Sequence, residues 1–203
     1  MNFKSLVGGL ALAVLATASV QAADTFVIDG THSTVGFKVT HLMVSKVRGH
    51  FDTFEGAIQL DPADTTKSSV EVSIDVASIN TGNDDRDNHL RAPDFFDAEK
   101  YPKITFKSTS IEKTGDTSYI ATGDLTIRDT TRKVALPFEM SGPVTDPWGN
   151  TRIGIEIEPV TIDRQDYGVS WSKAMDAGGV VVSDDVTLDL AAEAVQQKAA
   201  TAG

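Results

Sequence analysis

The chain has 203 residues, and its 29 aspartates and glutamates against 18 lysines and arginines give a formal charge of −11 at pH 7. An acidic surface of this size repels nucleic acid and anionic lipid headgroups, so we expect neither as a partner. The sequence contains no cysteine, which excludes disulfides, thiol catalysis, thiolate metal sites and a cysteine-linked lipid anchor. The length suits a single domain whose hydrophobic core alone suffices for stability.

The first 22 residues have the features of a secretory signal peptide. Lys4 gives a positive start, residues 6–20 are almost entirely small or apolar, and the V-Q-A triplet that ends at Ala22 resembles a cleavage site. The alternative, a transmembrane anchor, requires ~20 apolar residues, and this run is shorter and interrupted by glycine. We therefore predict an exported protein with one domain over residues 23–196, no stable membrane insertion and a disordered tail over 197–203.

Apolar and polar residues alternate along most of the chain after the predicted signal peptide, as they do in strands with one buried and one wet face. Turn signals rich in Asp, Gly, Pro and Thr separate the alternating runs. In chain order, the apolar faces of these runs fall within residues 35–39, 54–60, 70–76, 104–106, 125–127, 134–138, 153–157 and 186–190. About eight antiparallel strands must hide their apolar faces, so the sequence predicts an all-β domain built as two stacked sheets or as one closed barrel.

One stretch between the third and fourth alternating runs interrupts the pattern of strands. We predict a short helix there that begins with a capping box over residues 81–84, carries Arg91 in its last turn and ends at Pro93. The paired rings of Phe95 and Phe96 follow the helix. Apolar rings on a polar segment suit the mouth of a cavity, so we predict that this stretch is a helical plug between strands.

Two of the four histidines are candidate ligand contacts. His41 continues the inward parity of the 35–39 run, and it is either a hydrogen-bonded rim residue or a contact for a ligand headgroup. His89 lies on the predicted helix with Arg86 and Asp87, and the three form either a structural clamp or a headgroup site at the mouth. No pair of histidines has the spacing of a zinc site, so we predict no metal ligands.

Other catalytic or metal-binding patterns are weak in this sequence. Asp29, His32 and Ser33 resemble part of a hydrolytic triad, but no G-x-S-x-G elbow accompanies them, and an Asx-type turn explains them better. The carboxylates crowded between residues 84 and 99 suit a solvated helix face better than a calcium site. Nucleotide-binding and metalloprotease motifs are missing, and we predict a protein without enzymatic activity or cofactor.

The inward faces of the strands and the plug supply the candidate ligand-binding residues. An eight-stranded barrel can hold one small ligand among its interior side chains. Strands of about ten residues span ~33 Å at ~3.3 Å per residue, so a cavity along the barrel axis is long and slim and favours an aliphatic chain. The ligand-binding residues predicted from strand parity are Phe37, Val39, His41, Phe54, Ile58, Val72, Ile74, Leu90, Phe95, Phe96, Phe106, Leu125, Ile127, Leu136, Phe138, Ile155 and Trp171.

A series of short motifs has a specific order and spacing. The motifs are D-G-T-H-S from Asp29, V-T-H-L ending at Leu42, S-I-N-T from Ser78, R-D-N-H-L from Arg86, D-F-F-D from Asp94, Y-P-K-I-T-F from Tyr101, G-D-L-T-I-R from Gly123, D-P-W-G-N-T-R from Asp146 and R-Q-D-Y-G from Arg164. Together they resemble the YceI-like family of exported bacterial proteins, also called the polyisoprenoid-binding family, over residues 24–195. One departure follows the G-D-L-T-I-R motif: the family usually has a glycine, as in G-V-T-K, where this chain has D-T-T-R. We interpret the departure as a changed hairpin.

This resemblance implies a lipocalin-like antiparallel eight-stranded β-barrel whose interior holds a long isoprenoid chain, such as a polyprenyl lipid or the tail of a quinone. It also implies a periplasmic location, commonly a homodimer, and no fixed set of catalytic residues. We therefore expect a periplasmic binding or carrier protein for an isoprenoid lipid. Two alternatives stay open: an enzyme that acts on a lipid or quinone through a His and carboxylate pair at the barrel mouth, and a stress-induced structural protein with a filled barrel.

Overall fold

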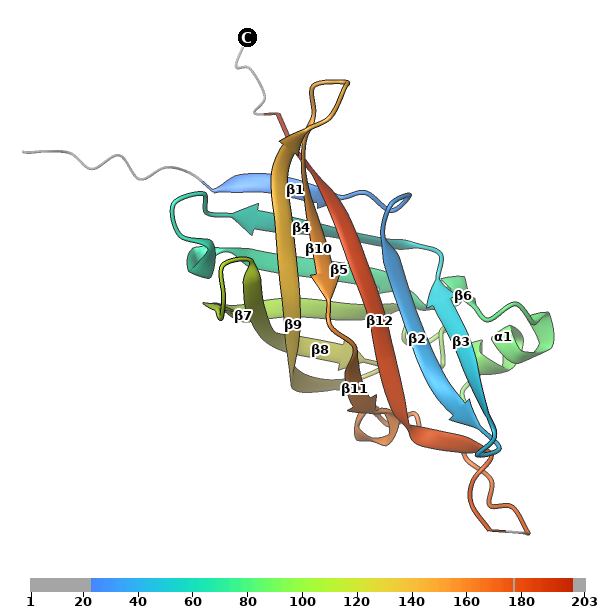
Figure 1. Ribbon diagram of the computed structural model, residues 1–203. Coiled ribbons are helices and arrows are strands. Elements are labelled where there is room, and N and C mark those ends of the chain that lie inside the picture. The colour runs from blue at the N-terminus through green and yellow to red at the C-terminus, as the bar shows by residue number, and fades with distance from the viewer. Residues whose placement is uncertain (1–22, 177, 199–203) are drawn as a thin grey trace, which may run out of the picture.

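The computed structural model describes residues 23–176 and 178–198 (Figure 1). These residues form an antiparallel β-barrel with one α-helix, α1 (Asp84–Arg91), which lies beside β3 and β6. The predicted signal peptide and positions 199–203 of the predicted tail lie outside the described residues. Among the described helices, none combines the length and the apolar character that a membrane crossing requires.

The barrel wall is a single sheet that closes on itself. Its strands are β1 (Asp24–Ile28), β2 (Thr34–His41), β3 (Ser45–Phe51), β4 (Phe54–Leu60), β5 (Ser69–Asp75), β6 (Ile79–Asn80), β7 (Lys103–Lys113), β8 (Ser118–Ile127), β9 (Thr130–Thr145), β10 (Thr151–Ile157), β11 (Val160–Asp163) and β12 (Val182–Gln196). The ring runs β1-β4-β5-β7-β8-β9-β10-β12 and closes where β12 pairs with β1. The predicted closed eight-stranded barrel is therefore confirmed, and the stacked sheets are excluded.

Several strands of the barrel consist of two segments, and the sequence pattern predicts only one segment of each pair. β1 and β2 pair one after the other along the same edge of β12, where Ala194 faces Ile28 and Ala191 faces Thr34. The pairs β3 and β4, β5 and β6, and β10 and β11 follow one another in the same way. Joined across these breaks, the strands form one continuous up-and-down series around the barrel.

The segments β2, β3, β6 and β11 extend the wall past the ring, and the plug lies at the opening between them. In this extension β12 is flanked by β11 on one side and by β2, β3 and β6 on the other. Arg91 of α1 donates to the carbonyls of Ala77 and Ile79 at 2.8 and 2.9 Å. On the opposite side, Arg128 of the β8–β9 hairpin donates to the carbonyls of Phe95 and Gly168. The plug is therefore tied to both edges of the opening.

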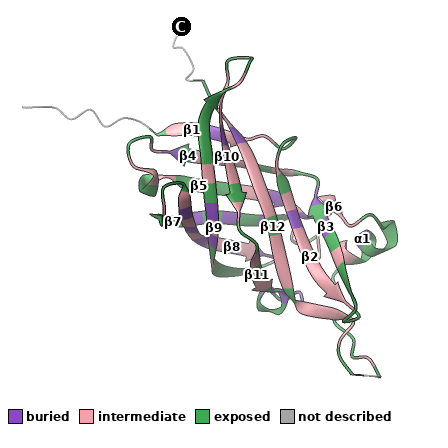
Figure 2. Ribbon diagram, viewed as in Figure 1, coloured by how far each residue is buried: buried purple, intermediate pink, exposed green. Residues whose placement is uncertain are grey.

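Inward and outward residues alternate along the strands as predicted. In β8, Leu125 and Ile127 are buried inside while the intervening Thr126 is not, and the buried residues of β7, β8 and β9 appear as purple bands in Figure 2. Gly123 allows the Phe106 ring to lie across the neighbouring strand, because a Cβ there would come within 2.6 Å of that ring. The period of two thus sets which residues reach the barrel interior.

The predicted start of the plug helix is wrong by two residues. Asn83, not Thr81, caps α1, and its side chain accepts a hydrogen bond from the Arg86 backbone N–H at 2.9 Å. Gly82 between them has a φ of +73°, and this left-handed residue turns the chain before the helix can begin. The last turn contains Arg91 as predicted.

Candidate ligand cavity

A cavity of about 270 Å³ lies inside the barrel, and mostly apolar side chains line it. Its volume is close to the lower end of the ~300–1,000 Å³ range of ligand pockets. All of the residues predicted from strand parity except His41 and Trp171 line it, namely Phe37, Val39, Phe54, Ile58, Val72, Ile74, Leu90, Phe95, Phe96, Phe106, Leu125, Ile127, Leu136, Phe138 and Ile155. They come from seven strands and the plug and form one cavity wall. That these residues bind a ligand stays a prediction.

Some residues of the wall are only half-buried although they lie in the middle of the sheet. Val72, Ile155 and Leu188 each have paired strands on both sides. Such strands shield a side chain laterally, so the surface that these residues still expose faces the cavity that they line. Packed protein interiors have few voids larger than a water molecule. The barrel interior is therefore not filled by its own side chains.

The end of the barrel where the ring closes is packed instead. Phe26 of β1, Ile153 of β10 and Ala194 of β12 are 2%, 1% and 0% exposed and belong to one apolar cluster. Leu60 belongs both to this cluster and to the cavity wall. The packed cluster therefore bounds the cavity at this end.

A second cavity of about 180 Å³ lies between the β2–β3 hairpin and the plug. It shares Phe37, Val39, Leu90, Phe95 and Val182 with the wall of the first cavity. The two cavities are therefore adjacent, and these side chains border both.

The second cavity brings together most of the predicted mouth residues. His41, Arg86, His89 and Trp171 all line it. Asp87 does not, and it is only 5% exposed. The wall of the second cavity therefore includes one guanidinium and two imidazoles, although the surface that it exposes to the cavity is almost wholly apolar.

Asp87 and Arg86 fix the start of the plug through Thr81. The Thr81 backbone N–H donates to the Asp87 carboxylate at 2.9 Å, and the Thr81 hydroxyl donates to the same oxygen. Arg86 donates through Nε to the Thr81 hydroxyl at 2.7 Å and through Nη2 to the Thr81 carbonyl at 2.8 Å. Asp87 is thus a structural clamp, whereas Arg86 both supports this turn and presents its side chain to the second cavity.

His89 connects the plug to the loop that carries Trp171. Its ring packs edge-on against Phe95 and against Trp171, with centroids 5.0 and 5.3 Å away. Its Nε2 lies 3.1 Å from the Asp94 carboxylate, which is well exposed to solvent. Such edge-to-face contacts are the favoured geometry of aromatic pairs. His89 therefore holds together the aromatic side of the second cavity.

Comparison with known proteins identifies the family of this barrel. The model of the YceI-like domain family matches residues 26–194. The chain belongs to the YceI-like domain family. A UPF0312 protein of Staphylococcus aureus is 38% identical over 168 residues, which cover 83% of this chain and 95% of that protein.

Solved structures of similar proteins have the same fold. The crystal structure of Burkholderia cenocepacia BcnA superposes with a TM-score of 0.72 at 25% identity and covers 82% of this chain and 98% of that one. The Campylobacter jejuni YCEI protein gives a TM-score of 0.68 at 34% identity, over 84% and 96% of the two chains. A domain from Saccharophagus degradans described as polyisoprenoid binding gives a TM-score of 0.66, over 87% and 100%. At 17% identity, this last likeness shows the fold alone.

In this YceI-like barrel the residues that resemble a hydrolytic triad form a turn. The Asp29 carboxylate accepts from the Thr31 backbone N–H at 3.0 Å and lies 2.9 Å from the His32 ring. The Ser33 hydroxyl donates to the Asp29 carbonyl at 2.7 Å and accepts from the Glu193 N–H at 3.0 Å. Because Ser33 bonds to backbone and not to His32, it has no general base, and the predicted Asx-type turn is confirmed.

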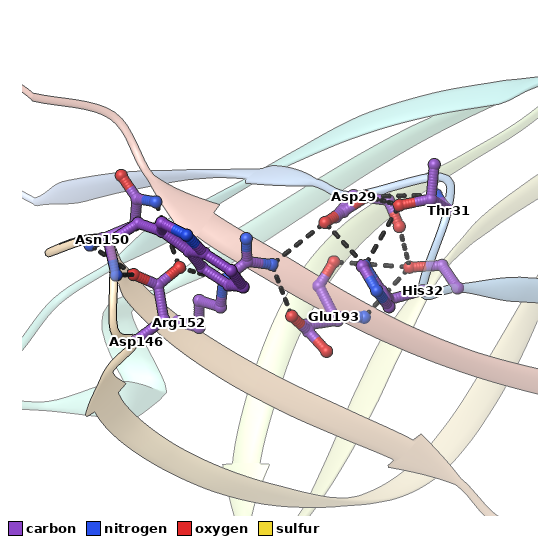
Figure 3. A network of polar contacts seen from close by, with 9 residues as sticks. Asp29, Thr31, His32, Asp146, Asn150, Arg152 and Glu193 are labelled. Carbon is purple, nitrogen blue, oxygen red and sulfur yellow. Dashed lines mark hydrogen bonds and ion pairs between the residues drawn. The ribbon is translucent and has the colours of Figure 1, made fainter.

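The same turn joins a charged network centred on Arg152 (Figure 3). Arg152 donates to Asp146 at 2.7 Å, to Asp29 at 3.0 Å and to Glu193. The Arg152 guanidinium holds the pKa of Asp146 well below its usual range, and hydrogen bonds from Thr31, His32 and Arg152 do the same for Asp29. Glu193 neighbours the inward Ala194 and so points to the outer face of the wall. The network braces the barrel and lies apart from both cavities.

Carboxylates and histidines gather at one place in the described part of the chain, where Asp29, His32 and Glu193 have the spacing of metal ligands. The positive charge of Arg152 already lies against two of these three residues. The carboxylates between residues 84 and 99 form no comparable group within residues 23–176 and 178–198. The geometry therefore favours an ion-pair network over a metal site.

Arg164 is a residue of the first cavity that strand parity did not predict. It is 6% exposed and donates to the carbonyls of Val169 and Ser183 and, at 3.0 Å, to Asp184. Burial lowers the pKa of this guanidinium, although the neighbouring carboxylates favour its charged form. It also lines the first cavity. Its only signal in the sequence is the R-Q-D-Y-G motif, because no alternating run includes it.

Strand parity also applies to wall residues that the prediction omitted. Val35, Val134 and Leu188 lie within the alternating runs 35–39, 134–138 and 186–190, and Phe51 and Ile104 lie on β3 and β7. Including every inward residue of these runs would have found the first three. Phe51 lies in β3, whose pattern is too polar to read as a strand with an apolar face.

Proposed function

We propose that this YceI-like protein binds a long-chain isoprenoid lipid, either a polyprenyl lipid or the tail of a quinone, and carries it through the periplasm. The observation that supports the proposal is an apolar cavity inside the barrel that adjoins a second cavity at the plug, whose wall includes His41, Arg86 and His89. The periplasmic location rests on the predicted signal peptide. The polyisoprenoid binding attributed to the Saccharophagus degradans domain, a relative in fold, agrees with this ligand class.

The lipid tail is the part of the ligand that provides the affinity. Each methylene moved from water into the cavity contributes ~0.8 kcal/mol. An isoprenoid tail has many such groups and needs no hydrogen-bond partner along its length, which suits the first cavity because strand residues such as Leu125 and Leu136 line it. A stress-induced structural barrel would gain nothing from such a cavity, since voids destabilise a core.

The headgroup lies in the second cavity in this proposal. The cationic or polar residues of its wall are His41, Thr81, Arg86 and His89. Two of the donors of Arg86 bond to Thr81 and fix the direction of the guanidinium. The arrangement offers a polar end for a quinone ring or an alcohol, with the tail directed into the barrel.

A matched pair of substitutions on one strand tests the proposal. Val134 lines the first cavity opposite Gly123, and Ala135 beside it is exposed on the outer face. We expect Val134→Trp to occupy the cavity and abolish binding of a polyprenol and of a long-chain quinone to delipidated protein, measured by native mass spectrometry. Ala135→Trp, which adds the same ring outside the barrel, should bind like the wild type. Equal binding by both variants would show that the cavity is not the site.

A second candidate function is acid–base catalysis on the bound lipid. The observation that favours it is the distance of 3.1 Å between His89 Nε2 and the Asp94 carboxylate, with His89 in the wall of the second cavity. A histidine oriented by a carboxylate is a competent general base. The His89→Gln variant distinguishes the two functions. If the protein is a carrier, the variant contains the same lipid as the wild type. If it is an enzyme, the variant accumulates the unreacted lipid, which mass spectrometry distinguishes from the product.

A further inference from the structure

The tip of the β2–β3 hairpin has three consecutive exposed apolar residues. Leu42, Met43 and Val44 are 39%, 60% and 84% exposed. The tip lies against the loop that precedes β12, where the Leu42 N–H donates to the Val181 carbonyl at 2.8 Å and Met43 approaches Gly179. In Figure 1 this hairpin and this loop reach the end of the molecule away from the chain termini. Exposed apolar groups of this kind mark interaction sites.

The backbone of the tip does not suit these side chains. The Val44 N–H donates to the His41 carbonyl at 3.1 Å and closes a turn whose central residues, Leu42 and Met43, have φ values of 51° and 61°. Hairpin turns with two positive φ values favour Asn and Gly, and bulky residues are strained there. Neither the turn nor the core therefore accounts for Leu42 and Met43, whereas an apolar partner outside the chain does.

The surface around the tip is basic although the chain as a whole is acidic. Residues 30–51 contain Lys38, Lys46 and Arg48 and no aspartate or glutamate. Lys38 pairs with Asp189 at 2.8 Å, whereas Lys46 and Arg48 have no carboxylate partner among the described residues. The three side chains point outward, because the alternate residues of the two strands line the cavities. The negative net charge predicts repulsion of anionic lipid headgroups, and this basic patch is a local exception.

Screening decides which of these charges a partner experiences. At physiological ionic strength the Debye length is ~8 Å, so exposed charges farther away than this are largely screened. A surface in contact with the tip therefore interacts with Lys46 and Arg48 at its base and with the exposed Asp185, which lies beside Thr40 at the start of β12, and much less with acidic residues farther away. Of the charges on the neighbouring loop, Lys173 and Asp176 offset each other.

The tip is also next to the second cavity. His41, immediately before Leu42, lines this cavity, as do Val47 on the returning strand and Val181, which bonds to Leu42. The hairpin tip and the loop before β12 thus carry exposed apolar residues on the outside and cavity wall on the inside. A lipid that enters or leaves the second cavity here passes directly beside Leu42.

We propose that this tip docks the protein on a lipid bilayer that contains anionic lipid. Leu42, Met43 and Val44 enter the interfacial region, and Lys46 and Arg48 contact the headgroups, so that a lipid passes between the bilayer and the second cavity. Peripheral proteins bind bilayers by this combination of buried apolar area and attraction to anionic lipid. The transfer of lipid in this scheme rests on the proposed function, whereas the docking itself can be tested separately.

The experiment is vesicle flotation of the full mature chain with phosphatidylcholine vesicles, with or without phosphatidylglycerol. We expect the wild type to float with the anionic vesicles and the double substitution Leu42→Asn with Met43→Gly to reduce the bound fraction about tenfold. The same substitution should raise Tm, because Asn and Gly suit this turn. A loss of binding together with a raised Tm cannot come from misfolding, and an unchanged bound fraction would overturn the proposal.

Two further variants separate the contributions to binding. Lys46→Gln with Arg48→Gln should remove the preference for phosphatidylglycerol and the sensitivity of binding to salt. Trp148→Ser removes the exposed ring of the distant β9–β10 hairpin, which is 79% exposed, and should leave flotation unchanged. If Trp148→Ser reduces binding as much as the tip variant does, docking is not specific to the tip and the proposal fails.

Two other results would also contradict the proposal. If the wild type does not float but is a dimer in sedimentation analysis, and the tip variant is a monomer, a second copy of the chain covers the tip. If the wild type does not float but solvent extraction recovers an isoprenoid lipid from it, docking is wrong and the proposed function stands. Flotation without any extractable lipid would support docking and contradict the proposed function.

Discussion

Apolar residues are packed tightly at one end of this barrel, whereas at the other end similar residues line cavities. Where the ring closes, Phe26, Ile153 and Ala194 are packed tightly, and Arg152 outside them has a carboxylate for each of its contacts. At the plug, rings and aliphatic side chains line two cavities, and the hairpin tip exposes Leu42 to solvent. The difference indicates that stability is concentrated at the first end, which leaves the second free to open and to bind.

The largest expected effect comes from two isoleucines of β10. Ile153 is 1% exposed in the packed cluster, and Ile155, two residues along the same strand, is half-buried in the cavity wall. Ile153→Ala should lower the free energy of unfolding by about 4 kcal/mol, because it leaves a void in a close-packed site. Ile155→Ala should cost roughly half as much, since it only enlarges an existing cavity. Urea denaturation measures both, and equal losses would contradict the contrast between the two ends.

A smaller effect is expected at the start of the plug. Asn83→Ala removes the side chain that accepts from the Arg86 N–H and should lower the free energy of unfolding by about 1 kcal/mol. Asn83→Asp is the matched control, because aspartate caps helices equally well, and its stability should be close to that of the wild type. Faster amide exchange of Arg86 in Asn83→Ala alone would locate the loss at the cap. A loss of equal size in both variants would argue against it.

Acid should weaken the packed end through the Arg152 network. The pKa values of Asp29 and Asp146 are lower in the folded chain than in the unfolded one, where aspartate titrates near ~3.9. Their contribution to stability is therefore complete above about pH 4 and is lost as the pH falls through the folded pKa values. We expect Tm to fall below about pH 4 in the wild type and to fall less steeply in Asp146→Asn. Asp116→Asn, in an exposed turn, should keep the wild-type slope.

Sequence pattern predicted the inward residues well because the period of a strand is fixed by its backbone. Val72, Leu125 and Leu136 line the cavity as their parity required. Ile153 and Ile155 have the same parity, yet one is packed and the other faces the cavity. That difference arises from how strands on opposite sides of the barrel meet, which no local pattern encodes.

The errors of prediction also arise from backbone geometry and contacts that a local sequence pattern does not encode. Thr81 and Asn83 are both good capping residues, and the positive φ of Gly82 decided between them. Arg164 lies in the cavity wall, where it bonds to the Ser183 carbonyl and the Asp184 carboxylate of β12, which are 19 and 20 residues away in the sequence. The breaks between paired strand segments likewise follow from closing the sheet into a barrel and not from any single run of residues.

The most direct test of the proposed lipid binding is solvent extraction and mass spectrometry of the protein purified from its own host. We expect to find an isoprenoid lipid in the wild type and in Ala135→Trp. Val134→Trp should lack this lipid, because its added ring occupies the cavity. A wild-type protein that yields no isoprenoid lipid, or a Val134→Trp variant that retains as much as the wild type, would contradict the proposed lipid binding.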